Sequence, residues 1–265
     1  MLEVINKGPC GESHKVPLLF VHGAWHGAWC WDEHFLDFFA DQGYRSLAVS
    51  LRGHGKSRPP KPMQFCSIAD FVDDVDSVAK SLPQRPVVIG HSMGGFVVQK
   101  YLESHDAPGA VLLASIPPSG ITGFLLRRFQ RHFWLTAGNM AITKSLRSVG
   151  GTPELTRETF FSEWTPDVDV VRYAAQLDEE YVGKLVLDML WLDLPRPNRV
   201  AAPLLVLGAE DDVCFTQKEV RATAAAYRTE AEIFAAMGHD MMLEPGWRAV
   251  AERIHAWLKV RVADK

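Results

Sequence analysis

Short apolar stretches alternate with longer amphipathic ones along this chain, and that alternation constrains its fold more than any other feature. A strand that is apolar on both faces is typical of a parallel sheet covered on both sides. The amphipathic stretches between the strands would supply the covering helices, so the sequence predicts an α/β fold with a doubly wound, mostly parallel sheet. The predicted strands are residues 17–21, 46–49, 86–89, 110–113, 203–207 and 232–235.

Two of the predicted helices show their buried face in the sequence. Ser67 can cap the first of them, with Asp70 three residues later as its capping-box partner. Apolar residues then recur at helical spacing, and the same pattern returns near the end of the chain. The apolar positions are 68, 71, 72, 75, 79 and 82 in the first helix, and 247, 250, 254, 257 and 258 in the second.

One long segment, from residue 117 to residue 202, breaks the alternation because it contains no convincing strand. Much of it has helical character, interrupted by Gly150, Gly151 and several prolines. An insertion of this length between two strands is more typical of a subdomain than of a loop. We therefore expect one α/β core, residues 1–116 and 203–265, with a helical cap inserted at residues 117–202.

Composition and charge exclude several classes of function. The 265 residues include 28 basic and 32 acidic side chains, a formal net charge of −4, whereas nucleic-acid binding needs a basic surface. No apolar run approaches the roughly 18 residues of a membrane-spanning helix, and the first residues do not resemble a signal peptide. The four cysteines share no CxxC spacing, so neither a zinc site nor a disulfide framework is expected, and a cytoplasmic location is.

The segment 90–94, Gly-His-Ser-Met-Gly, matches the pattern G-x-S-x-G and lies between a predicted strand and a predicted helix. This is the context of a nucleophile elbow. The glycines permit a tight turn that would hold Ser92 in strained backbone geometry, with its hydroxyl above the sheet at the positive end of the following helix. The alternative is a glycine-rich turn with an idle serine.

A histidine and a carboxylate that could activate Ser92 follow in the chain order expected of such a site. A serine hydroxyl is a poor nucleophile near neutral pH and needs a base. Among the 10 histidines, His239 follows the last predicted strand, at the sheet edge where open α/β folds place their chemistry. The acid should follow the preceding strand, where residues 210–212 supply three successive carboxylates. Spacing alone does not choose among them.

Two backbone amides are candidates for binding the oxyanion of a tetrahedral intermediate. One belongs to Met93, the residue after the predicted nucleophile. The other should come from the loop at residues 22–25, after the first long strand. Gly23 in this loop would let the backbone approach the substrate closely.

Taken together, these segments resemble those of α/β-hydrolase-fold serine hydrolases of the esterase, lipase and lysophospholipase type. In that family the acid usually stands in a G-x-x-D motif, which implies Asp211, with Asp212 as the alternative. The resemblance also implies oxyanion amides from Ala24 and Met93, and no cofactor. The matching segments are residues 20–29, 52–57, 90–95, 208–211 and 238–239.

The predicted cap opens with an aromatic and basic stretch at residues 124–135. Arginines stand at positions 127, 128 and 131 among the apolar side chains. The plain interpretation is a helix that packs on the core; the alternatives are an acyl-chain pocket and transient contact with an anionic membrane surface. We expect Phe124 and Phe129 of the cap, with Trp25 and His91 of the core, to contact the substrate.

The function predicted from these residues is that of a serine carboxylic-ester hydrolase that works through an acyl-enzyme. A large apolar cap favours an apolar acyl group, so we expect esters with a medium or long chain, of the monoacylglycerol or lysophospholipid type. A lactonase or amidase with the same triad is the first alternative. A non-hydrolytic ligand-binding or receptor protein is the alternative of another class, but it has no need of Ser92, Asp211 and His239 together.

Overall fold

A seven-stranded sheet in the order β1-β3-β2-β4-β5-β6-β7 forms the centre of the computed structural model, which describes residues 1–9, 14–131, 152–180 and 183–262. The first strand pairs with β3 in antiparallel fashion, and the other neighbouring strands are parallel. The predicted doubly wound, mostly parallel sheet is therefore confirmed. The strands are β1 (Val4–Lys7), β2 (Leu18–Val21), β3 (Ser46–Val49), β4 (Val87–His91), β5 (Ala110–Leu113), β6 (Leu204–Ala209) and β7 (Ala231–Phe234).

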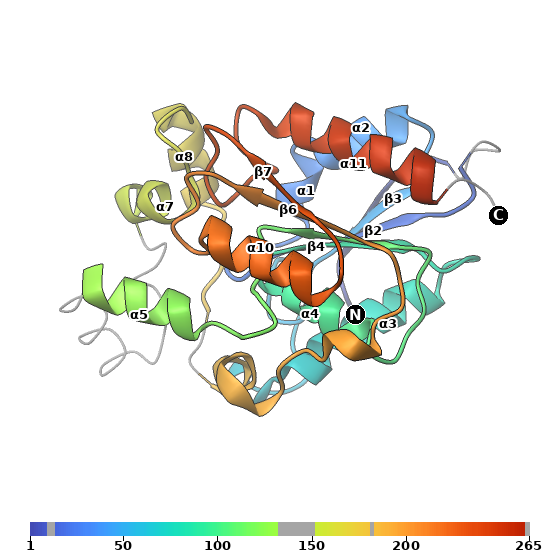
Figure 1. Ribbon diagram of the computed structural model, residues 1–265, viewed down its shortest axis with the longest axis horizontal. Helices are drawn as coiled ribbons and strands as arrows, with labels where there is room; N and C mark the ends of the chain where they lie inside the picture. The colour runs from blue at the N-terminus through green and yellow to red at the C-terminus, as the bar shows by residue number, and fades with distance from the viewer. Residues whose placement is uncertain (10–13, 132–151, 181–182, 263–265) are drawn as a thin grey trace.

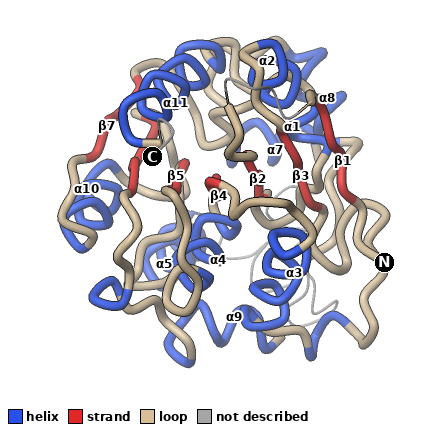
Figure 2. The backbone as a smooth tube through the Cα atoms, turned by 90° about the vertical axis from the view of Figure 1, so that its right-hand side faces the viewer, coloured by secondary structure: helices blue, strands red, loops and turns tan. Residues whose placement is uncertain are grey.

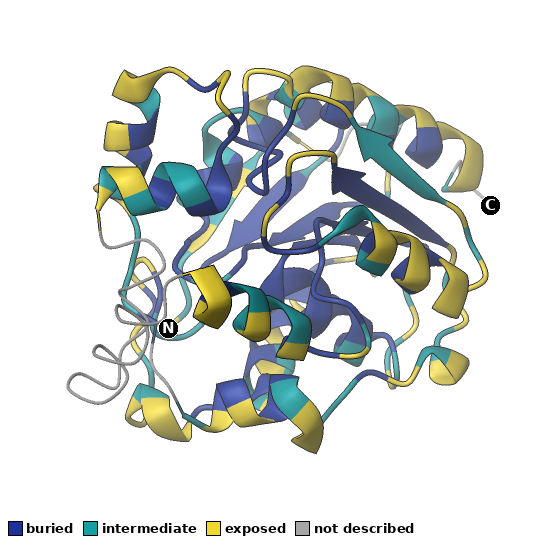
Figure 3. Ribbon diagram, turned by 60° about the vertical axis from the view of Figure 1, so that its left-hand side comes forward, coloured by how far each residue is buried: buried dark blue, intermediate teal, exposed yellow. Residues whose placement is uncertain are grey.

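Helices cover both faces of this sheet (Figures 1 and 2). One face carries α1 (Trp29–Asp32), α2 (Phe35–Asp41) and α11 (Trp247–Arg261). The other carries α3 (Ile68–Lys80), α4 (Met93–Tyr101) and α10 (Gln217–Ala226). In β2, Leu18 and Phe20 belong to the first core, and Leu19 and Val21 belong to the second. This explains why the central strands are apolar at nearly every position and lie buried (Figure 3).

The edge strand β1 is one element that the sequence did not predict. Its four residues alternate between exposed and half-buried positions, so it lacks the continuous apolar character of the central strands. Because it pairs only with β3 and lies at the edge of the sheet, it needs no second apolar face.

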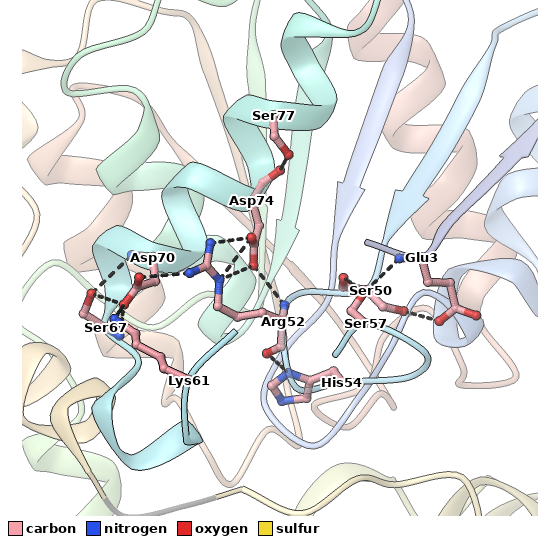
Figure 4. A network of polar contacts seen from close by, with 10 residues as sticks. All are labelled: Glu3, Ser50, Arg52, His54, Ser57, Lys61, Ser67, Asp70, Asp74 and Ser77. Atoms are coloured by element: carbon pink, nitrogen blue, oxygen red, sulfur yellow. Dashed lines mark hydrogen bonds and ion pairs between the residues drawn. The ribbon is translucent and has the colours of Figure 1, made fainter. Parts of the chain in front are cut away.

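Helix α3 begins as the sequence predicted, with a capping box. The Ser67 side chain accepts from the Asp70 amide, and the Asp70 carboxylate accepts from the Ser67 amide at 2.8 Å. The same carboxylate accepts from Arg52 Nη1 at 2.9 Å, and Arg52 also donates from Nη2 to Asp74 Oδ1 at 2.7 Å (Figure 4). The loop after β3 is thus tied to α3 by one mostly buried guanidinium.

We expect the Arg52→Gln substitution to lower the free energy of unfolding by about 1–3 kcal/mol, because it leaves the buried Asp74 carboxylate without its cation and leaves Asp70 paired with Lys61 alone. Urea unfolding monitored by circular dichroism measures the change. The control is Arg221→Gln on α10, where the exposed arginine donates to Gln217 and an effect within about 0.5 kcal/mol is expected. Equal stability of the two variants would show that the Arg52 network contributes nothing.

Between β5 and β6 the described residues form helices and no strand. These helices are α5 (Thr122–Arg131), α7 (Pro153–Phe160), α8 (Asp167–Ala174), α9 (Lys184–Leu187), a π-helical turn (Asp188–Leu192) and a 3₁₀ turn (Pro197–Arg199). A further 3₁₀ turn (Met63–Phe65) precedes α3. Helices α5, α7 and α8 lie at one end of the sheet (Figure 1). The part of the predicted cap helix at residues 132–135 lies outside the described residues, and no helix among the described residues is long and apolar enough to cross a membrane.

Candidate active site

Ser92 occupies the turn between β4 and α4, where the sequence placed it. Its backbone has φ 52° and ψ −117°, which is a strained conformation for a residue with a side chain. The turn is tight because α4 begins directly against the strands: a Cβ added to Gly94 would lie 2.3 Å from the carbonyl oxygen of Val21. The strained geometry predicted for this serine is therefore confirmed.

His239 lies beside a buried carboxylate that comes from the turn after β6. With its proton on Nδ1, the imidazole donates to Asp212 Oδ2 at 2.9 Å, and both side chains are almost fully buried. The other carboxylate oxygen of Asp212 accepts from the amides of Cys214 at 2.7 Å and Phe215 at 3.0 Å. Three hydrogen bonds thus fix the carboxylate that orients His239.

The assignment of this carboxylate to Asp211 is wrong, and the structure places Asp212 there instead. Strand β6 continues to Ala209, two residues beyond the predicted strand, so the turn that follows also begins later. Asp211 lies in this turn with an exposed side chain, while its amide donates to the carbonyl of Met237 at 3.0 Å. Asp212 is the first residue after the turn that is buried.

Two opposing influences set the pKa of His239. Burial lowers it, but the Asp212 carboxylate raises it through its charge and hydrogen bond, and the net pKa lies above the ordinary 6.5. Such an imidazole is well suited to take up a proton during a reaction, because the carboxylate stabilises the imidazolium that forms.

His91 does not line the cavity, contrary to the expectation that it contacts the substrate. It is buried behind His239, where its Nε2 donates to the carbonyl of His239 at 3.0 Å. Burial lowers the pKa of His91 to about 3, with the neighbouring His239 acting in the same direction. His91 is therefore a neutral hydrogen-bond donor that holds the backbone of His239.

A second buried pair, His26 and Asp240, supports the same region and was not singled out from the sequence as part of the site. His26 Nε2 lies 3.0 Å from Asp240 Oδ2, and His26 Nδ1 lies 2.8 Å from the carbonyl oxygen of Ala24. Burial raises the pKa of Asp240, but His26 and two other histidines outweigh it, so the net pKa is lowered. The residue after His239 is thereby connected to the loop after β2.

A cavity of about 400 Å³ opens in front of Ser92 and His239. The structure places three of the four predicted substrate contacts in its wall, namely Trp25, Phe124 and Phe129. Ala24 and Met93 line it too, and the remaining wall is mostly apolar. Other large apolar side chains in the wall include Leu126, Phe160, Met189, Leu190 and Phe215.

The loop after β2 lies directly against the nucleophile turn. A Cβ added to Gly23 would lie 2.9 Å from both the Ser92 Cβ and the His91 Nδ1, so only glycine allows this approach. Ala24, the next residue, therefore lies close to Ser92. Met93 is the first residue of α4, and an amide at this position has no carbonyl partner within its own helix. Both predicted oxyanion amides are consistent with this placement.

Within the described part of the chain, two groups of buried side chains have ligand atoms close enough to share a metal ion. They are His91, His239 and Asp240, and Asp212, Cys214 and His239, with ligand atoms within 4.8 Å in each. Both groups contain His239, whose Nδ1 is already hydrogen-bonded to Asp212. We interpret Asp212 and His239 as an acid–base pair, with His91 and Asp240 holding the surrounding backbone in place.

The comparison with known sequences places this architecture in a known group. A family model described as "Alpha/beta hydrolase family" matches residues 18–253. A non-heme chloroperoxidase of Streptomyces lividans is 36% identical over 113 residues, which is 41% of this chain and 40% of that protein. Methylesterase 18 of Arabidopsis thaliana is 34% identical over 86 residues, 32% of this chain and 31% of that protein. The matched region thus spans less than half the length of these relatives.

Solved structures match over almost the whole length. A thermophilic esterase from Thermogutta terrifontis has a TM-score of 0.73 at 20% identity, covering 97% of this chain and 93% of that one. The monoacylglycerol lipase of Paleococcus ferrophilus has a TM-score of 0.72 at 21% identity, covering 98% and 99%. At these identities the likeness shows the shared fold.

Proposed function

Since the chain belongs to the alpha/beta hydrolase family, we propose that it is a serine carboxylic-ester hydrolase. One observation carries the proposal: Ser92, whose backbone is strained, lines the same cavity as His239. The Nδ1 of His239 is hydrogen-bonded to the buried Asp212 carboxylate at 2.9 Å. A nucleophile, a base and a group that orients the base are the parts that acyl transfer requires.

In the proposed mechanism the Ser92 Oγ attacks the ester carbonyl carbon while His239 Nε2 takes the hydroxyl proton. The tetrahedral intermediate then collapses to an acyl-enzyme, and His239 returns the proton to the leaving alkoxide. Water next attacks the acyl group, with His239 again as base, and the acid product leaves with Ser92 restored. Throughout, Asp212 keeps the Nδ1 proton in place. The amides of Ala24 and Met93 bind the oxyanion of both tetrahedral intermediates.

The wall of the cavity supports an apolar acyl group as the part of the substrate that it holds. Charged and polar lining side chains are few, and include Ser92, Thr122, Glu180 and His239. A volume of about 400 Å³ holds roughly 13 non-hydrogen atoms at about 30 Å³ each, the share of a molecule in liquid water. We therefore propose esters of medium-chain acids, such as octanoyl or decanoyl, with a small alcohol of the monoacylglycerol type.

Transient contact of the cap with an anionic membrane surface is a separate prediction, on which this proposal does not depend. Leu126 and Phe129 are 56% and 43% exposed, as such contact requires. However, Arg127 pairs with Glu219 at 2.9 Å and Arg131 pairs with Glu158 at 2.8 Å. These pairs offset basic charge that would otherwise attract anionic lipid.

Hydrolysis of p-nitrophenyl esters from acetyl to palmitoyl tests the proposal. We expect kcat/KM to peak at the octanoyl or decanoyl ester. Because Val186 lines the cavity, Val186→Phe should move the optimum to shorter chains. Equal or better turnover of the acetyl ester would contradict the medium-chain assignment.

Covalent labelling by a fluorophosphonate separates an enzyme from a binding protein on this fold. We expect labelling of the wild-type protein at Ser92 and none in Ser92→Ala. A folded wild-type protein that neither labels nor hydrolyses any ester would overturn the proposed function. Lactone and amide substrates, assayed in parallel, decide between an esterase and the alternatives that share its triad.

A further inference from the structure

Trp25 follows the proposed oxyanion residue Ala24 and has an unusual backbone conformation. Its φ is +64°, in the left-handed region that is strained for a residue other than glycine. Such a conformation persists only where the surroundings hold it. In this chain the holding groups come from the inserted segment, far away in sequence.

Both peptide groups of Trp25 are bonded to residues of that segment. The Asp178 amide donates to the Trp25 carbonyl at 2.7 Å. The Trp25 amide donates to Glu180 Oε2 at 3.4 Å. A two-sided contact of this kind fixes the peptide plane on each side of Trp25 and thereby restrains Ala24, whose amide belongs to the preceding peptide group.

Glu180 is itself held by His54. The same Oε2 lies 3.0 Å from His54 Nε2, and the side chains of Glu180 and His54 are 3% and 0% exposed. The other ring nitrogen of His54 lies 3.3 Å from the carbonyl oxygen of Arg52, so both ring nitrogens face acceptors. Burial lowers the pKa of His54, but the charge of Glu180 outweighs it and the net pKa is raised. The contact therefore favours the protonated form of His54.

The loop that carries His54 is firmly anchored to the core (Figure 4). Arg52 bonds to the carboxylates of α3, as described above, and Ser57 Oγ donates to the carbonyl of Ser50 at 2.6 Å. Ser57 also accepts from the Glu3 amide at 2.8 Å. In addition, the amide of Gly55 in this loop donates to Asp178 Oδ2 at 2.7 Å. The inserted segment thus joins two loops at the carboxyl edge of the sheet.

We propose that Glu180, together with Asp178 and His54, positions the proposed oxyanion loop by holding Trp25 from both sides. We call these three residues the Trp25 clamp. Glu180 is a positioning residue in this proposal, since it acts on the reaction through Trp25 and Ala24. The inference rests on the proposed function, because Ala24 matters to the chemistry only if its amide binds an oxyanion.

The kinetic test is Glu180→Gln, which keeps the size of the side chain and removes its charge. A loosened oxyanion amide weakens transition-state binding, whereas the loss of a whole donor costs about 100–1,000-fold in kcat. We expect kcat to fall by about 10–100-fold with KM within about twofold of wild type. The affinity for an alkyl boronic acid, which mimics the tetrahedral intermediate, should fall by the same factor as kcat.

The matched control is Glu163→Gln, an exposed carboxylate of the same inserted segment, and its kinetics should equal those of wild type. His54→Gln supplies a second variant should Glu180→Gln fail to fold, and the same fall in kcat is expected. A fall of kcat/KM that comes mainly from KM, or unchanged kinetics in both clamp variants, would overturn the proposal.

Hydrogen–deuterium exchange tests the clamp independently of any substrate. Peptides that cover residues 22–27 should exchange several-fold faster in Glu180→Gln than in wild type or Glu163→Gln, with the rest of the sheet unchanged. Unchanged exchange in these peptides would contradict the proposed role of the Trp25 clamp, even if the enzyme is active. Faster exchange in a protein that hydrolyses no ester and labels with no fluorophosphonate would instead leave the clamp standing and overturn the proposed function.

Discussion

Replacement of Ser92 by alanine should reduce kcat by about 10⁴–10⁶-fold while the fold persists. Without the hydroxyl no acyl-enzyme forms, and His239 and Asp212 are left with no nucleophile to activate. What remains is the slow direct attack of water, helped by the oxyanion amides. Since alanine has a Cβ like serine, the strained backbone at φ 52° costs both proteins alike, and stability should change little.

The measurement is the initial rate on the best p-nitrophenyl ester, with urea unfolding of both proteins as the stability control. A variant that keeps a tenth or more of the activity would remove Ser92 from the mechanism. A variant that loses activity only because it unfolds would show a lowered urea midpoint, and the rate would then say nothing about the hydroxyl.

The second large effect is expected at Asp212 and not at its neighbour. Asp212→Asn should reduce kcat by about 10³–10⁴-fold, because an amide in this place can hold His239 in the wrong tautomer and cannot stabilise the imidazolium. Asp211→Asn is the matched control: it changes the same chemical group one residue earlier, on an exposed side chain, and should stay within about twofold of wild type. A larger fall of kcat in Asp211→Asn than in Asp212→Asn would show that Asp211 is the acid.

The pH dependence of kcat/KM follows from the same contact. His239 must be neutral to accept a proton, so activity is lost as the pH falls through its pKa. In wild type that pKa is raised above 6.5 by Asp212, and the acid limb should lie above pH 6.5. In Asp212→Asn the lowering effect of burial on the pKa of His239 is opposed only by the smaller effect of Asp240, and the acid limb should move to lower pH. A limb that stays in place would show that Asp212 does not set the pKa of His239.

Local sequence patterns were enough to predict the sheet and the chain order of the site. The central strands are apolar on both faces, and the Ser67–Asp70 capping box fixes the start of α3 within a few residues. Ser92 follows β4 directly, and only residues 235–238 separate β7 from His239, so the topology alone brings both to one edge of the sheet. The prediction of the acid failed because residues 210–212 are three successive carboxylates. Which of them faces His239 depends on the residue at which β6 ends, and the sequence does not show that residue.

The residues that hold the site residues in place could not be predicted from local sequence patterns. His91 looked like a substrate contact because it adjoins Ser92, yet its side chain turns to the His239 carbonyl 148 positions away. Glu180 stands 126 positions from His54, in a segment whose helices show no motif. Contacts between residues so distant depend on how the inserted segment packs, and no periodicity or spacing encodes that.

The neutrality of His91 has a consequence for how the site responds to its surroundings. The residue that titrates, His239, and the residue that braces its backbone, His91, are both imidazoles with ring centroids 4.7 Å apart. Burial brings the pKa of the brace to about 3, so it gains no charge between neutral pH and mild acid. Acidification should therefore inactivate the site by protonating His239, while His91 stays neutral and keeps its hydrogen bond to the His239 carbonyl.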